Sequence, residues 1–119
     1  MIMKRERIAK LLHYSIDNFL REHFPLSSCD CLITVTTVKV TPDGKKADVF
    51  LSFMTLGRKE EVGEKIVQDL IKRIEEEKVL LKREIAFRLG RKLRVLPEVH
   101  FSRDERASKV SRIEELLGK

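Results

Sequence analysis

Two runs rich in β-branched and aromatic residues, separated by a short turn, constrain the fold of this chain most strongly. The first is LITVTTVKV, residues 32–40, and the second is ADVFLSFM, residues 47–54. TPDGKK lies between them, and this composition favours a turn because Pro fixes φ and Gly accepts a positive φ. The sequence therefore predicts a β-hairpin. Alternate residues of the second strand would share one face: Ala47, Val49, Leu51 and Phe53.

Helical patterns lie on both sides of this hairpin. Residues 4–22 carry apolar side chains at i, i+3 and i+4, which predicts an amphipathic helix, and Pro25, Ser27 and Ser28 predict the loop after it. After a break at residues 56–58, the same spacing runs from residue 59 to residue 89 without a proline. Such a helix is long for a small domain, so we expect a bend. Residues 74–78 are the best place, because the charge changes sign there.

The last third of the chain predicts a helix end and a third strand. Gly90 follows the last periodic apolar residue, which is the usual position of a helix C-cap. Residues 93–101 alternate, with Pro97 at a sheet edge or at a bulge because proline cannot donate to a ladder. Residues 102–106 read as a loop, and residues 108–117 as a short helix or a tail. This order predicts one α+β domain, with a three-stranded sheet and helices on one face.

Positive charge is concentrated in one segment. The chain carries a net charge of +6, and residues 78–94 alone hold seven basic residues and one acid, Glu84. The rest of the chain has equal numbers of basic and acidic residues, 18 of each. A clustered basic patch indicates a polyanionic ligand such as a nucleic acid. The alternative is a solvated helix face, which accounts for many charge runs.

The sequence gives little sign of a metal or of catalysis. Cys29, Cys31 and His23 offer three ligands where a closed zinc site needs four, so two reduced cysteines near a strand edge are the simpler interpretation. His100 alternates with strand residues and is expected to face solvent. The chain also lacks a P-loop, G-x-S-x-G, H-E-x-x-H and G-x-G-x-x-G. We therefore expect no enzyme activity, no catalytic residues, no metal and no cofactor.

The N-terminal sequence and the apolar runs bear on location. MIMKRERIAK has no apolar core and does not resemble a signal peptide, and the apolar runs are too short to cross a bilayer. We therefore expect a cytoplasmic protein that does not associate with membranes.

Four segments, in order and at similar spacing, resemble ribosome-binding factor A, a family of small-subunit assembly factors. They are RERIAKLL at residues 5–12, the hairpin LITVTTVKVTPDGKKADVFLSF, LKREIAFRLGRKLRVLPEVHF, and SRIEELL at residues 111–117. The resemblance implies a type II KH-like fold, α-β-β-α-α-β, with an RNA-binding domain over residues 1–104 and a tail or short helix over residues 105–119. The family resembles this chain in lacking Gly-x-x-Gly. It carries Ala-x-Gly at a helix kink, however, and neither residue occurs here at residues 77–79. The segment 86–90 is also two residues longer than the corresponding segment of the family pattern.

The resemblance implies non-catalytic binding to the immature small (30S) ribosomal subunit, with contacts to 16S rRNA and neighbouring ribosomal proteins. The implied roles are support of rRNA 5′-end processing and late subunit maturation, commonly in cold adaptation, by a protein that is a monomer off the ribosome. The expected phosphate contacts fall into a main and a supporting group. The main group is Arg83, Arg88, Arg91, Lys92 and Arg94, and the supporting group is Lys45, Lys46, Lys4, Arg5 and Arg7.

Two other functions compete with this one. A protein-interaction module could use a sheet edge or the terminal SRIEELLGK segment. A general single-strand binder would stack bases on aromatic rings, but Tyr14 and six phenylalanines are the only rings available. The apolar pattern places most of these rings in the core, which argues against the second alternative.

Overall fold

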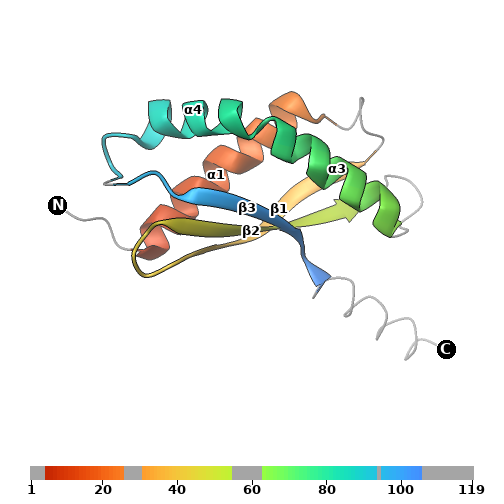
Figure 1. Cartoon of the computed structure of the whole chain (residues 1–119), viewed down its shortest axis with the longest axis horizontal. Helices are drawn as coiled ribbons and strands as arrows, with labels where there is room; N and C mark the ends of the chain where they lie inside the picture. Colours follow the sequence, from red (N-terminus) through yellow and green to blue (C-terminus); the bar gives the residue numbers. More distant parts are fainter. Residues whose placement is uncertain (1–4, 26–30, 55–62, 94, 106–119) are drawn as a thin grey trace.

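A computed structural model describes residues 5–25, 31–54, 63–93 and 95–105 (Figure 1). The observed order is α-β-β-α-α-β, as expected. The elements are α1 (Arg5–His23), β1 (Leu32–Val40), β2 (Lys46–Met54), α3 (Glu64–Glu76), α4 (Lys78–Leu89) and β3 (Glu98–Arg103). The expected features at Ser27, Ser28, residues 56–58 and residues 108–117 lie outside the described residues.

The three strands form one sheet in the order β1-β2-β3. β1 and β2 are antiparallel, which confirms the predicted hairpin, and β3 runs parallel to β2. Between β1 and β2, Gly44 adopts a φ of 74°, the left-handed region that favours glycine. The carboxylate of Asp43 accepts hydrogen bonds from the Thr41 hydroxyl at 2.6 Å and from the Lys45 backbone N–H at 3.0 Å. These contacts fix the turn that the TPDGKK sequence predicted.

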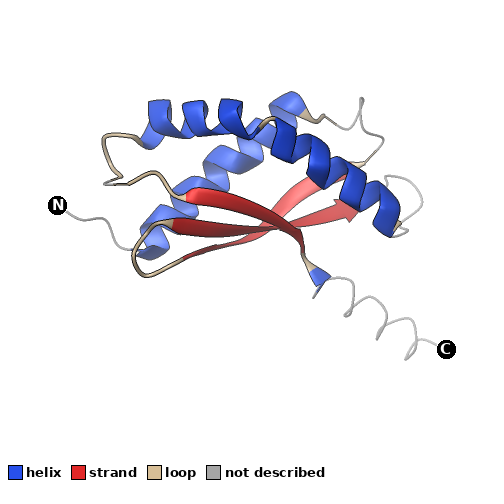
Figure 2. Ribbon diagram, viewed as in Figure 1, coloured by secondary structure: helices blue, strands red, loops and turns tan. Residues whose placement is uncertain are grey.

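All three helices cover one face of the sheet (Figure 2). α1 packs against β1 and α4, and α3 packs against β3. The residues of β2 expected to share a face are all buried, and the residues between them are not. The helices complete the core with Leu12, Ile16, Phe19 and Leu20 from α1, Val67, Leu70 and Ile74 from α3, and Leu81, Ile85 and Leu89 from α4.

The long helical pattern is broken at Glu77, within the predicted residues 74–78. Glu77 has φ −92° and ψ 10°, and its N–H donates to the carbonyl oxygen of Ile74 at 3.1 Å. α4 then begins, and the N–H of Leu81 donates to the carbonyl oxygen of Glu77 at 3.1 Å. These angles lie in the bridge region of negative φ, which residues other than glycine occupy in type I turns. The break therefore requires neither the alanine nor the glycine of the family pattern.

The third strand begins later than the alternating pattern predicted. β3 starts at Glu98 rather than at residue 93, and it extends through Arg103 into the expected loop. The ladder begins with the N–H of Glu98, which donates to the carbonyl oxygen of Lys45 at 2.8 Å. Alternate residues of a strand direct their N–H groups to opposite sides, so the position of Pro97 faces the free edge, where no N–H is needed. The expected alternation fails in the same place, because Val95 is 50% exposed. Pro97 therefore precedes the strand and forms no bulge within it, whereas the alternative expectation of a sheet edge is confirmed, because β3 is an edge strand.

A bulge occurs instead in β1, where the pairing register shifts between Val35 and Thr37. The hydroxyl of Thr36 lies 3.1 Å from the carbonyl oxygen of Phe50 and donates to the carboxylate of Asp104 at 2.5 Å. Asp104 is only 7% exposed, and its N–H donates to the carbonyl oxygen of Leu51 at 2.8 Å. The bulge thus ties β1 to the residue that follows β3.

α1 and α3 are amphipathic, with charged side chains along their exposed faces. α4 also exposes charged side chains, but Val79, Leu80 and Phe87 are exposed among them. Among the described residues, no helix combines the length and the apolar character needed to cross a bilayer.

Candidate nucleic-acid interface

Exposed cations from three separate segments gather at one end of the molecule. The first turn of α1, the β1–β2 turn and the end of α4 with its following turn all lie at the left end in Figure 1. We call the cations on these segments the basic end surface. It consists of Arg7, Lys45, Lys46, Arg88, Arg91 and Lys92, all of which are exposed.

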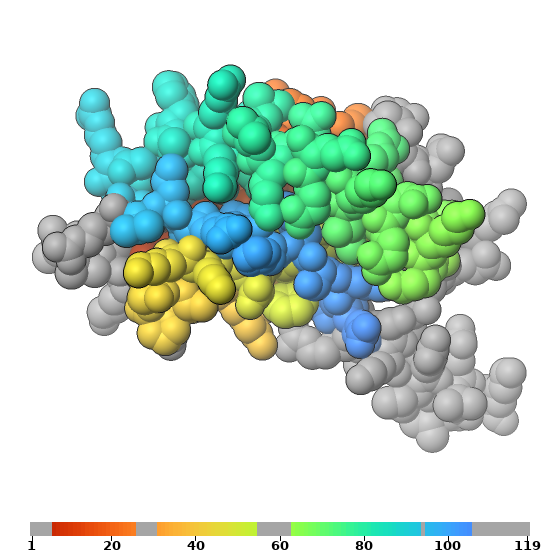
Figure 3. Space-filling view, in the orientation of Figure 1, coloured from red at the N-terminus to blue at the C-terminus, as the bar shows by residue number. Residues whose placement is uncertain are grey.

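A backbone hydrogen bond links the β1–β2 turn to the chain that follows α4. The N–H of Glu98 donates to the carbonyl oxygen of Lys45, and Lys46 pairs with Glu98 in the β2–β3 register. The β1–β2 turn therefore lies against the chain that leads from α4 into β3, and Figure 3 shows the two segments in contact, in yellow and blue. Sheet pairing thus brings lysines of the hairpin beside the basic segment at the end of α4.

Gly90 ends α4, as expected, but not through a left-handed conformation. Its φ is −54° and its ψ is −35°, and its N–H donates to the carbonyl oxygen of Ala86 at 2.9 Å. A Cβ at this position would lie 2.3 Å from that same oxygen. The N–H groups of Lys92 and Leu93 both donate to the carbonyl oxygen of Leu89, at 2.9 and 3.0 Å. The close approach at Gly90 therefore lets the chain continue to curl through the turn that carries Arg91 and Lys92.

The expected phosphate contacts are only partly brought together. Six of the ten form the basic end surface. Arg83 is exposed but lies further back along α4, about 7.5 Å before Arg88 along the helix axis at 1.5 Å per residue. Lys4 and Arg94 lie outside the described residues, and of Arg5 only the backbone, at the start of α1, is described.

Ion pairs engage some cations of the described fold but none of those on the basic end surface, a property that they share with other exposed lysines such as Lys65 and Lys72. Elsewhere, Arg21 pairs with Asp17 at 3.0 Å, Lys78 with Glu75 at 2.8 Å, and Arg103 with Glu64 at 2.9 Å. Within the part of the chain that the structure describes, no cation of the basic end surface has a carboxylate oxygen within 4.0 Å of its charged nitrogen atoms. Their charge is available to an external anion.

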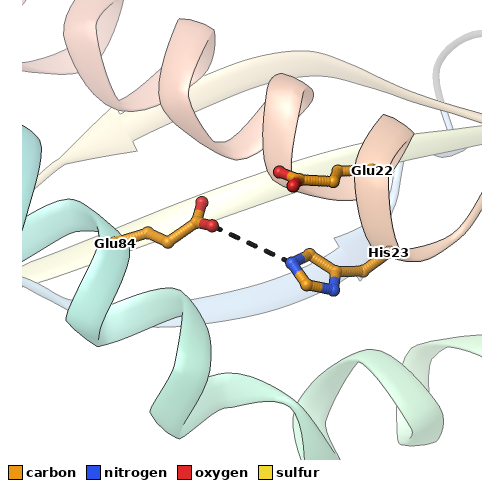
Figure 4. A group of neighbouring side chains, drawn as sticks. All are labelled: Glu22, His23 and Glu84. Carbon is orange, nitrogen blue, oxygen red and sulfur yellow. Dashed lines mark ion pairs between the residues drawn. The ribbon is translucent and has the colours of Figure 1, made fainter.

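The end of α1 and α4 form a separate cluster of Glu22, His23 and Glu84 (Figure 4). The Nε2 atom of His23 lies 3.8 Å from a carboxylate oxygen of Glu84, and its ring stacks at 4.3 Å on Phe19. The potential ligand atoms of the three residues lie within 4.8 Å of one another. The contact between His23 and Glu84 accounts for two members of this group, and exposed acidic groups such as Glu22 are common without an ion, so we assign no metal to it.

Of the three residues considered as zinc ligands, the structure describes Cys31 and His23. Cys31 is a buried, reduced thiol at 2% exposure, directly before β1, whereas His23 faces Glu84. Cys29 lies outside the described residues.

Two exposed carboxylates, Asp43 and Glu64, have lowered pKa values. The Thr41 hydroxyl, followed by the Lys45 N–H, lowers the pKa of Asp43 from its ordinary 3.8. Hydrogen bonds from Gln68, and then from Arg103, lower the pKa of Glu64 from its ordinary 4.5. Neither carboxylate is poised to transfer a proton near neutral pH.

A family model described as Ribosome-binding factor A matches residues 4–117. The chain belongs to the ribosome-binding factor A family. A ribosome-binding factor A from Rhodopseudomonas palustris is 34% identical over 117 residues, which cover 96% of this chain and 78% of the relative. One from Chlorobium phaeobacteroides is 28% identical, with 98% and 93% covered. The family is named for binding the ribosome and not for a reaction.

The crystal structure of ribosome-binding factor A from Thermus thermophilus shares the fold. It superposes with a TM-score of 0.62 at 17% identity and covers 85% of this chain and 97% of that one. The KH-like order expected from the resemblance is therefore confirmed for the described elements.

The exposure of one aromatic residue, Phe87, was not predicted from the sequence. Phe87 is 92% exposed on α4, whereas the apolar pattern predicts that most of the phenylalanines lie in the core. The helical phase gave the signal: Leu81, Ile85 and Leu89 are spaced at i+4 and are buried, and Phe87 falls between them on the other face.

Proposed function

We propose that this protein binds the immature small ribosomal subunit through the basic end surface, which contacts phosphates of 16S rRNA. The observation that carries the proposal is a set of six exposed cations at one end of the fold, none of which has an ion-pair partner among the described residues. Such cations gain affinity by displacing counterions from a polyanion. Membership of a family named for ribosome binding supports the choice of polyanion.

The protein acts without catalysis in this proposal. Docking of a charged surface on the rRNA would stabilise a late intermediate of the small subunit and support processing of the rRNA 5′ end. The partners are the rRNA and the ribosomal proteins beside it, which makes the protein cytoplasmic. We also propose that residues 1–104 form the binding domain, and that residues 105–119 form a separate tail.

Sedimentation with purified particles tests this function. Small subunits, large subunits and intact ribosomes are each pelleted with the protein at a low and at a high salt concentration. We expect the protein to pellet with free small subunits at low salt, to be released as salt rises, and not to pellet with large subunits. Equal recovery with both subunits would indicate nonspecific attraction between opposite charges, and this result would contradict the proposal.

A further inference from the structure

Phe87 has the most exposed large apolar side chain among the described residues. It is 92% exposed, and Val79, two helical turns earlier on α4, is 68% exposed. The core-facing side of α4 is already complete, because Leu81, Ile85 and Leu89 are buried there. Phe87 therefore contributes little to the packing of the described fold, and its ring is presented to solvent.

Arginines lie on both sides of this ring along the helix. Arg83 precedes Phe87 by four residues and Arg91 follows it by four, and side chains four apart are neighbours on a helix surface. The backbone hydrogen bonds from Gly90 to Ala86 and from Leu93 to Leu89 extend this helical spacing past the end of α4. The face thus presents arginine, ring and arginine in one row.

The charge around the ring indicates which partner it suits. The segment 78–94 holds one acid, Glu84, and this carboxylate lies 3.8 Å from Nε2 of His23, where α4 meets α1. The row of Arg83, Phe87 and Arg91 therefore carries positive charge only. An RNA strand matches this row, because each unpaired base offers an apolar face and is flanked by phosphates.

We propose that Phe87 stacks on an unpaired base of the bound RNA, while Arg83 and Arg91 contact the phosphates on either side of that base. This inference rests on the proposed function and specifies part of it. It gives Arg83, which lies away from the basic end surface, a contact of its own. It also predicts a single-stranded or bulged element of RNA beside α4, with double-stranded phosphates free to lie against the basic end surface.

Three substitutions of Phe87 distinguish stacking from other uses of an exposed apolar residue. Phe87→Ala removes the ring, Phe87→Leu keeps apolar bulk without a ring, and Phe87→Tyr keeps the ring. We expect Phe87→Ala and Phe87→Leu both to weaken binding to purified small subunits by roughly 10- to 100-fold, the range typical of removing one base–aromatic stack. Phe87→Tyr should bind within about 3-fold of the unmodified chain. Thermal unfolding of each variant should be unchanged, because the side chain is exposed.

A photo-crosslinking phenylalanine analogue in place of Phe87 identifies the partner in the same particles. We expect crosslinks to rRNA, and none when the analogue replaces Ile66, an exposed apolar residue of α3. Crosslinks to a ribosomal protein, or affinity retained by Phe87→Leu but lost by Phe87→Ala, would overturn the inference in favour of a protein contact. Unchanged affinity in every variant would overturn it as well.

The two proposals fail separately. If substitutions at Phe87 have no effect while removal of cations from the basic end surface abolishes binding, the inference is wrong and the proposed function stands. If neither set of substitutions affects binding to small subunits, both are wrong.

Discussion

The backbone N–H of Glu98 donates a hydrogen bond of 2.8 Å to the carbonyl oxygen of Lys45. This contact joins the first residue of β3 to the β1–β2 turn, so two basic segments that lie far apart in the sequence become neighbours. The parallel register of β2 with β3 determines where the contact falls, because the even-numbered residues of β3 direct their N–H groups at β2. Pro97 is compatible with this register, since an N–H at its position would face the free edge of the sheet.

Gly90→Ala should destabilise the protein through a steric clash. The added Cβ would lie 2.3 Å from the carbonyl oxygen of Ala86, so the last turn of α4 must shift. We expect the free energy of unfolding to fall by about 1–3 kcal/mol, as for other overpacked sites, when it is measured by urea denaturation. Gly63→Ala is the matched control, because a Cβ there meets nothing within 4 Å. Equal effects at both glycines would show that the contact with Ala86 is not limiting.

Thr36→Val should destabilise the protein by removing the hydroxyl donated to Asp104. Asp104 is 7% exposed, and a hydrogen bond to a charged group contributes about 1.5–3 kcal/mol. We expect a decrease in that range by chemical denaturation. Thr34→Val, two residues earlier in β1, is the control, and its effect should stay within about 0.5 kcal/mol because surface substitutions away from such contacts have small effects. A Thr36→Val variant as stable as the control would contradict this role of the bulge.

Thr41→Ala should raise the pKa of Asp43 toward its ordinary value of 3.8, because the Thr41 hydroxyl is the main cause of the lowered pKa. The folded-state pKa lies below the unfolded value, so the ionised carboxylate stabilises the folded turn above the unfolded pKa. This stabilisation is lost as the pH falls through the folded pKa, in the acid range below about 4. Titration of the side-chain carboxyl by NMR measures the shift directly. An Asp43 pKa unchanged by Thr41→Ala would assign the shift to the Lys45 N–H instead.

Local chemistry made the first half of the fold predictable. β-branched alternation and the Pro-Asp-Gly turn specify the hairpin within its own residues, and the predicted face of β2 is buried. The helix break was also visible, as a change in the sign of the charge near Glu77. The features of the fold that the sequence did not predict, such as the β1 bulge, depend on tertiary contacts. Nothing in the sequence near Thr36 indicated a bulge, because the hydroxyl bonds to Asp104, 68 residues away.

The candidate site was predictable in composition but not in arrangement. The excess charge of residues 78–94 was evident, and Arg88, Arg91 and Lys92 do lie together. Their meeting with Lys45 and Lys46 depends on parallel pairing of β2 with β3, which no local pattern shows. Phe87 was missed because the helix was read as having a single apolar face.

The salt dependence of binding to small subunits tests the central claim most directly. Removal of three cations of the basic end surface, Arg88→Gln, Arg91→Gln and Lys92→Gln, is compared with an equal change of charge in Arg21→Gln, Lys65→Gln and Lys72→Gln. The control cations are exposed and lie away from that end, in the last turn of α1 and in α3. The affinity of each variant for purified small subunits is measured over a series of salt concentrations.

If the basic end surface contacts rRNA phosphates, the first variant binds more weakly, and its plot of log affinity against log salt is less steep by roughly one unit for each phosphate that it no longer neutralises. The control keeps the slope of the unmodified chain. Equal slopes for the two variants would mean that net charge, and not this surface, attracts the subunit, and they would contradict the account.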